Sequence, residues 1–126
     1  MQSERPVNIN LSPTRFRWPV TAMASILHRI TGAVLFVALA FLLYLLQLAL
    51  PSAEGFAAAA ALLETPLAKL TLWITLSLVI YHIVAGVKHL LLDFHMGDTM
   101  EAASAASWAV LVISAVLAVL AGAWIW

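Results

Sequence analysis

The sequence predicts an all-α membrane protein with three transmembrane helices, and three observations lead to that prediction. Of the 126 residues, 64% are hydrophobic and 10% are charged, whereas a soluble domain has about 45–50% apolar and about 25% charged residues. The mean hydropathy is +1.04. Three long stretches contain no Asp, Glu, Lys or Arg: residues 30–53, 70–87 and 102–126. A chain this short cannot bury so much apolar surface in its own core, so a lipid bilayer is the expected solvent.

The spanning helices are expected at about residues 22–50, 66–92 and 104–126. A spanning helix needs about 20 mostly apolar residues, which the first and third uncharged stretches supply. The second stretch is shorter, but Lys69 and Lys88 at its ends extend it, because their side chains reach toward the polar interface. Prolines suit these boundaries: Pro19 and Pro66 fit first helical turns, and Pro51 follows the first span.

Two segments lie outside the spans. Residues 1–21 form a polar arm, expected at the lipid headgroups, and residues 22–126 form the transmembrane domain. The arm is not a signal peptide, because the apolar run behind it is much longer than the core of such a peptide. The alanine-rich residues 56–63 are expected to form a short interfacial helix.

The distribution of basic residues predicts the orientation. With three spans, one membrane side receives five basic residues and the other receives only Lys69. The five are Arg5, Arg15, Arg17, Arg29 and Lys88. The positive-inside rule therefore places the N-terminus in the cytoplasm and Trp126 on the opposite side.

Composition also excludes several functions. The formal net charge is zero, so no basic field indicates a nucleic-acid partner. The chain has no cysteine, which excludes disulfides, thiolate metal sites, an iron–sulfur cluster held by this chain and covalent attachment of a c-type haem. Any redox centre must be bound non-covalently, with histidine as the expected ligand.

Polar residues cluster at the start of the first span. Ser25, His28, Arg29 and Gly32 are spaced by three, four and seven residues, so they share one helical face. A hydroxyl and a guanidinium are hydrogen-bond donors suited to a carbonyl or a carboxylate. Flanking positive charge with a helix cap is an equally good interpretation of the spacing alone.

A second cluster lies near the end of the second span, where His82, Gly86, His89 and Asp93 form one stripe. His82 lies about 9 Å deeper than Lys88, inside the hydrocarbon region. A neutral imidazole is a haem ligand, and Gly86 would leave room for a flat macrocycle. The alternative is that His82 only bonds a neighbouring helix.

The topology brings both clusters to the cytoplasmic side. The start of the first span and the end of the second meet there. Six residues are therefore expected to gather at one membrane face above His82: Ser25, His28, Arg29, Lys88, His89 and Asp93. Lys88 and His89 are placed to pair with haem propionates.

Three segments of this sequence resemble one family. The segments Arg5-Pro6-Val7, Ser25-Ile26-Leu27-His28-Arg29-Ile30-Thr31-Gly32 and the run from His82 to Asp93, with its His-x3-Gly-x-x-His pattern, resemble the large cytochrome b anchor subunit of succinate dehydrogenase, of bacterial type. The resemblance covers nearly the whole chain. Lys88 departs from it, since many relatives have arginine there, and the arm lacks the Pro-His-Leu-x-Ile-Tyr stretch of many members.

The resemblance implies a subunit that is not an enzyme on its own. His82 would be one axial ligand of haem b, with the second histidine supplied by a small anchor subunit. His28, His89 and Arg29 would lie near the haem propionates, and Ser25 and Arg29 would line the ubiquinone site. A flavoprotein subunit would oxidise succinate and an iron–sulfur subunit would relay electrons. The complex would lie in the bacterial inner membrane, with the C-terminus periplasmic.

Three alternatives belong beside this interpretation. A haem-free structural anchor would use His82 only for helix packing. The equivalent subunit of a quinol:fumarate reductase would share the same residues. A small transporter would show discontinuous helices or inverted repeats, and the sequence has neither.

Overall fold

The structure, a computed structural model, describes residues 18–126. This part of the chain contains four helices and no strand. They are α1 (Val20–Ala49), α2 (Ala53–Leu63), α3 (Pro66–Asp93) and α4 (Met100–Ile125). The predicted all-α class is confirmed. The predicted polar arm, residues 1–21, falls largely outside the described residues.

Within that range, α1, α3 and α4 are long and apolar enough to cross a membrane, with peak mean hydropathies of 2.4, 2.0 and 2.4. The short helix expected at residues 56–63 is present as α2. The last helix begins at Met100, four residues before the expected start. The Thr99 side chain accepts a hydrogen bond from the Ala102 N–H (3.2 Å), and Glu101 lies in the first turn, where a negative charge is favourable.

Local chemistry sets the other boundaries. Ser52 caps α2 by accepting a hydrogen bond from the Gly55 N–H at 3.0 Å. Thr65 caps α3 in the same way, and Pro66 occupies the first helical position, where its missing N–H costs nothing. After α3 the chain reverses through Gly97, whose φ of +82° is readily adopted by glycine.

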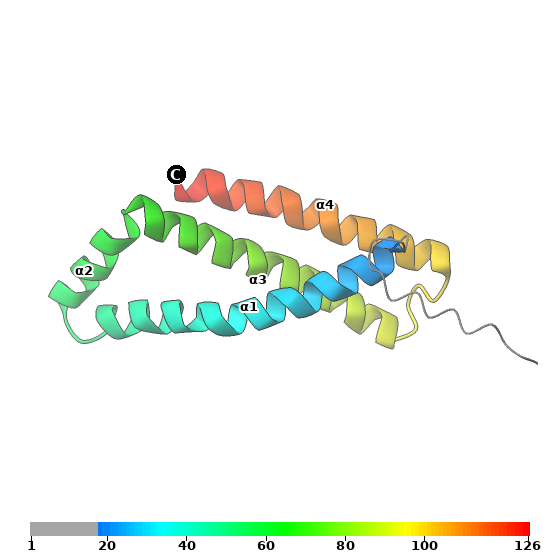
Figure 1. The fold of residues 1–126 in the computed structure, drawn as a ribbon, viewed down its shortest axis with the longest axis horizontal. Coiled ribbons are helices and arrows are strands. Elements are labelled where there is room, and N and C mark those ends of the chain that lie inside the picture. Colours follow the sequence, from blue (N-terminus) through cyan, green and yellow to red (C-terminus); the bar gives the residue numbers. More distant parts are fainter. Residues whose placement is uncertain (1–17) are drawn as a thin grey trace, which may run out of the picture.

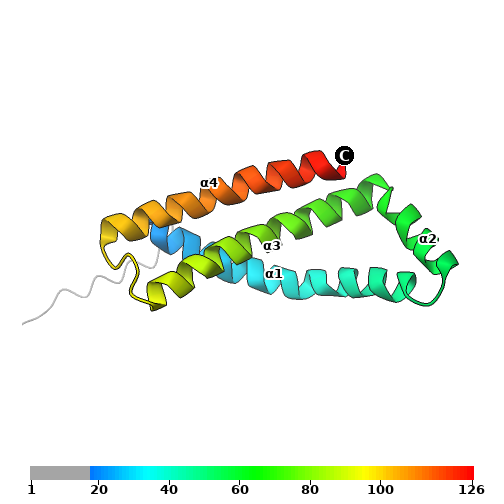
Figure 2. The ribbon, with the colours of Figure 1, turned by 180° about the vertical axis from the view of Figure 1, so that it is seen from behind.

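Helix α3 lies between α1 and α4 (Figures 1 and 2). Helix α1 crosses α3 close to the start of α1 and then diverges from it, and α2 spans the widening gap at the far end. The start of α1, the end of α3 and the start of α4 therefore share one end of the bundle. We call this the α1 entry end.

The distribution of polarity is the reverse of that in a soluble protein. Most large apolar side chains are exposed, with Phe36 at 79% and Trp124 at 82%. The buried positions are small or polar: Ala24, Thr31, Ala59, Ala68, Thr75, Ala85, Lys88, Ser107, Val110 and Ser114. Helices that are apolar on all sides are typical of a membrane, and small residues allow close helix packing there.

At the far end of the bundle, a tryptophan and a glycine bring α3 and α4 together. Trp73 Nε1 on α3 donates a hydrogen bond to the Ala118 carbonyl on α4 at 2.8 Å. The indole lies directly against Gly122, where a Cβ atom would come within 3.0 Å of Nε1. The absence of a side chain at Gly122 therefore lets α3 and α4 approach closely.

Candidate functional site

The candidate site lies where α1 crosses α3, and its centre is the imidazole of His82. Nδ1 of His82 is 3.2 Å from the His28 carbonyl oxygen and 3.2 Å from Thr31 Oγ1. Thr31 donates its own proton to the same carbonyl at 2.9 Å, so its oxygen is free to accept. Both partners therefore require the proton on Nδ1, and this assigns the tautomer in which Nε2 keeps its lone pair.

The three intramembrane histidines lie together. The His28 and His82 rings stack, with centroids 4.2 Å apart and planes 20° from parallel. The His89 ring is 5.1 Å from the His28 ring and tilted by 43°. His28, on α1, is thus the middle member of a group whose other two members come from α3.

Two glycines give these rings their space. A Cβ atom at Gly32 would lie 3.0 Å from Cε1 of His82, which is closer than ordinary packing allows. A Cβ atom at Gly86 would lie 3.5 Å from Nε2 of His28, an ordinary van der Waals distance. In this chain it is the His28 ring that lies against Gly86, whereas Gly32 leaves the space that His82 needs.

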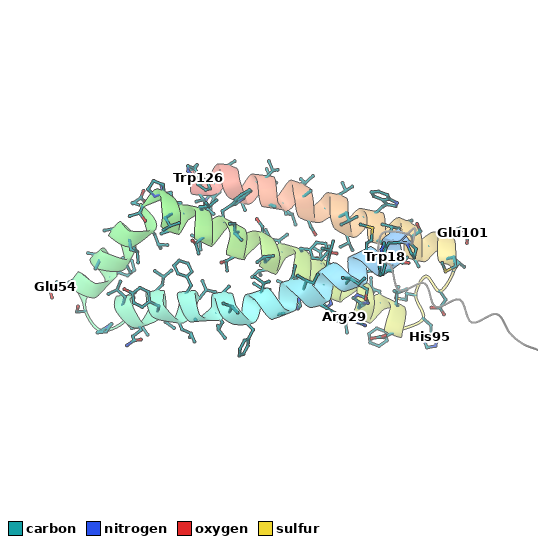
Figure 3. All side chains as sticks on the ribbon, in the orientation of Figure 1. Trp18, Arg29, Glu54, His95, Glu101 and Trp126 are labelled. Atoms are coloured by element: carbon teal, nitrogen blue, oxygen red, sulfur yellow. The ribbon has the colours of Figure 1, made fainter. Side chains whose placement is uncertain are left out.

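The polar residues of the first cluster lie at the α1 entry end. Figure 3 shows Arg29 at the same end of the bundle as Trp18, His95 and Glu101, opposite Glu54 and Trp126. Arg29 is exposed, and Ser25, one turn earlier on α1, is half-buried. Asp93 is exposed at the end of α3.

Lys88 does not join the histidines. It is 6% exposed and lines a cavity between α3 and α4. One residue along an α-helix turns by about 100°, so His89 faces α1 while Lys88 faces α4. Lys88 and His89 therefore face different helices, and their pairing with haem propionates stays a prediction.

Sequence reasoning gave no role to two residues that position this site. Thr31 is buried and holds His82, as described above. Tyr81 donates a hydrogen bond from its hydroxyl to the Ala24 carbonyl at 2.9 Å, which ties α3 to α1 one residue before His82. Thr31 belongs to the segment from Ser25 to Gly32 that carries the family resemblance. It follows His28 by three residues, about one helical turn, and that spacing could have indicated its place beside the histidines.

The donor set limits what the site can bind. Residues 18–126 contain no group of three or more His, Cys, Asp or Glu side chains placed to hold a bare metal ion. Haem iron makes no such demand, because the macrocycle supplies four ligands and the protein supplies only the axial ones. An apolar groove of about 300 Å³ adjoins Thr31 between α1 and α3, and Leu27, Trp73 and Tyr81 are among its lining residues.

Comparison with known proteins gives the family. Residues 1–121 match the family model described as succinate dehydrogenase/fumarate reductase transmembrane subunit. The chain belongs to this family. A succinate dehydrogenase cytochrome b556 subunit of Coxiella burnetii is 40% identical over the full length of both chains. A subunit with the same description from Paracoccus denitrificans is 33% identical, covering 94% of this chain and 90% of its own.

Membership in the family confirms the resemblance found in the sequence. The chain is a cytochrome b membrane subunit of the succinate dehydrogenase type, and it crosses the membrane several times. A further relative, the cytochrome b556 subunit of Rickettsia bellii, is 27% identical over 94% of this chain. A subunit of this kind implies partner subunits, and its apolar surface implies a lipid bilayer.

Proposed function

We propose that this chain anchors a succinate dehydrogenase in the bacterial inner membrane, provides one axial ligand of haem b through His82, and forms part of the ubiquinone-reduction site. The observation that carries the proposal is the hydrogen bonding of His82. Its Nδ1 is fixed by the His28 carbonyl and Thr31, so Nε2 is the nitrogen available to iron. Haem ligands usually donate their second ring nitrogen to a carbonyl in this way, which orients the ring and raises its basicity.

The surroundings of His82 fit a haem. When bound, haem b supplies a one-electron redox centre that stores an electron between the iron–sulfur relay and the quinone. Stacking against His28 and contact with Gly32 restrict the His82 ring to one orientation. A restricted ring loses little entropy on binding iron, which favours ligation. The second axial histidine is assigned to the small anchor subunit.

The propionates of the haem are assigned to the α1 entry end. Arg29 and His89 lie on that side of His82, and His28 lies between His89 and His82. Cationic and imidazole N–H donors there would neutralise two carboxylates that otherwise face an apolar medium.

The quinone is assigned to Ser25 and Arg29. They are one turn apart on α1, where a hydroxyl and a guanidinium can donate to the same quinone oxygen. Their position near the end of the bundle gives protons access from the aqueous side. The N-terminal side is assigned to the cytoplasm and the C-terminus to the periplasm, on the positive-inside rule.

Succinate oxidation is assigned to the flavoprotein partner, with electrons relayed by the iron–sulfur subunit. This chain has no cysteine to hold a relay cluster. The equivalent role in a quinol:fumarate reductase would use the same residues in the opposite direction of electron flow.

The haem assignment is tested by replacing His82 with leucine in the whole complex. The variant should lose or strongly alter the reduced-minus-oxidised b-type spectrum. His89→Leu is the matched control, since it removes an imidazole two turns away on the same helix and should change the spectrum less. An unaltered spectrum and paramagnetic resonance signal in the His82 variant would instead favour the haem-free anchor, in which His82 only bonds α1.

The quinone assignment is tested separately with Ser25→Ala and Arg29→Leu. A hydrogen bond to a charged group contributes roughly 1.5–3 kcal/mol, and about 1.4 kcal/mol corresponds to tenfold in affinity. Quinone reduction should therefore weaken by roughly ten- to a hundredfold, with Arg29→Leu the more severe. Succinate oxidation with a water-soluble dye should be unchanged. Wild-type quinone kinetics in both assembled variants would refute the assignment.

A further inference from the structure

Lys88 is a buried cation that the proposed haem and quinone sites do not use. Its residue exposure is 6%, and within residues 18–126 it makes no hydrogen bond or ion pair. Lys69, at the other end of α3, contrasts with it by bonding Glu64 at 2.8 Å near the surface. Apolar groups surround the Lys88 side chain, and in such surroundings an ammonium favours an anionic partner.

The surroundings of Lys88 indicate the kind of anion. Lys88 lines a cavity of about 240 Å³ between α3 and α4, and the other lining groups are almost entirely apolar. The cavity begins at Met96 and Ala102, near the α1 entry end, and continues along α4 to Ile113. Eleven residues of helix separate Ala102 from Ile113, so the cavity extends about 16 Å into the membrane.

The rim of this cavity reaches the outer surface of the bundle. Val87 is 50% exposed, Leu91 is 43% exposed and Met96 is 61% exposed. Lys88 itself lies five residues before the end of α3, which is about 8 Å below the end of the helix. A lysine at this depth extends its ammonium toward the headgroup layer.

From this geometry we infer that the α3–α4 cavity is a binding site for an anionic phospholipid, with the lipid phosphate on Lys88 and an acyl chain along the apolar cavity. A phospholipid matches both halves of the site: a negative group at headgroup depth and an apolar chain that continues inward. A small soluble anion would leave the apolar part of the cavity empty. The site is separate from the histidine group, which lies on the α1 side of α3.

The inference is tested on the intact complex, purified in mild detergent and washed until its phospholipid content is constant. Bound lipid is then quantified by headgroup for wild type, Lys88→Met and Lys88→Arg. Wild type and Lys88→Arg should retain a tightly bound anionic lipid, whereas Lys88→Met should lose it. Lys69→Met is the control that removes a lysine from the opposite end of the same helix, and it should retain the lipid.

A second variant tests the apolar half of the site without touching the charge. Ala106 lines the cavity, and Ala106→Leu should fill part of it and also release the lipid. Titrating the delipidated complex with phosphatidylglycerol and with phosphatidylcholine should show a preference for the anionic lipid in wild type. Removal of Lys88 should weaken phosphatidylglycerol binding by roughly ten- to a hundredfold.

Three outcomes would overturn the inference. Equal lipid content in wild type and Lys88→Met would show that Lys88 holds no lipid. Equal binding of both lipids in wild type would remove the role of charge. Dissociation of subunits from Lys88→Met, with the lipid still present in Ala106→Leu, would show that Lys88 pairs with a carboxylate of a partner subunit.

Discussion

Replacing Gly32 with alanine adds one methyl group beside the proposed haem ligand. The new Cβ atom would lie 3.0 Å from Cε1 and 3.6 Å from Nδ1 of His82. The ring must move by a few tenths of an ångström to relieve this contact. In the proposed haem-bound state, iron at Nε2 and hydrogen bonds at Nδ1 would hold the ring, so the cost should fall mainly on that state.

The size of the added group sets the expected loss of haem affinity. Overpacking by a methyl group costs about 1–3 kcal/mol, which corresponds to roughly a 5- to 100-fold loss of haem affinity. The gain in helix propensity, about 1 kcal/mol for glycine to alanine, is common to both haem-bound and haem-free states and cancels in the affinity.

Gly86→Ala is the matched control. It makes the same chemical change in α3, but its Cβ atom would lie 3.5 Å from Nε2 of His28, an ordinary contact. Haem content per complex and the reduced-minus-oxidised spectrum should therefore change in Gly32→Ala and stay near wild type in Gly86→Ala. If the two variants behave alike, or if only Gly86→Ala loses haem, the contact between Gly32 and His82 does not control the ligand.

Three further predictions concern other parts of the chain. Thr31→Val keeps the side-chain shape but removes a hydrogen-bond partner of His82. The complex should therefore lose about 1 kcal/mol of stability, and its haem midpoint potential should shift. An unchanged potential would contradict the role of Thr31. Gly122→Ala should displace Trp73 and cost about 1–3 kcal/mol, seen as faster thermal inactivation, while Ala123→Ser on the exposed side of α4 should have little effect. A reporter fused after Trp126 should be active only outside the cytoplasm, and cytoplasmic activity would mean that the orientation is reversed.

The sequence predicted the helices well because a membrane imposes a simple rule. Long uncharged stretches must be helical to satisfy their backbone hydrogen bonds in lipid. The predicted start of the last helix was four residues too late. The prediction excluded Glu101 because a charged residue is unfavourable in a spanning segment, but Glu101 suits a first helical turn capped by Thr99.

The histidine group was predicted less completely. Spacing placed His82 and His89 on one stripe, and topology brought His28 to the same end of the bundle. The sequence could not show that His28 stacks on His82 or that Gly32 provides the space for the His82 ring. Both features depend on where α1 crosses α3. For the same reason the sequence could not show that Lys88 lines a cavity against α4, since the side of α3 that faces α4 is a tertiary property.

The central claim is that this chain holds one axial ligand of a haem, and the haem of the native complex tests it most directly. Haem content is measured by pyridine haemochromogen, and low-temperature paramagnetic resonance reports the axial ligands. The account predicts one b-type haem per complex, low-spin in the oxidised state and bound by two imidazoles. A complex that reduces ubiquinone but contains no haem, or whose oxidised haem is high-spin with a single imidazole, would contradict the account.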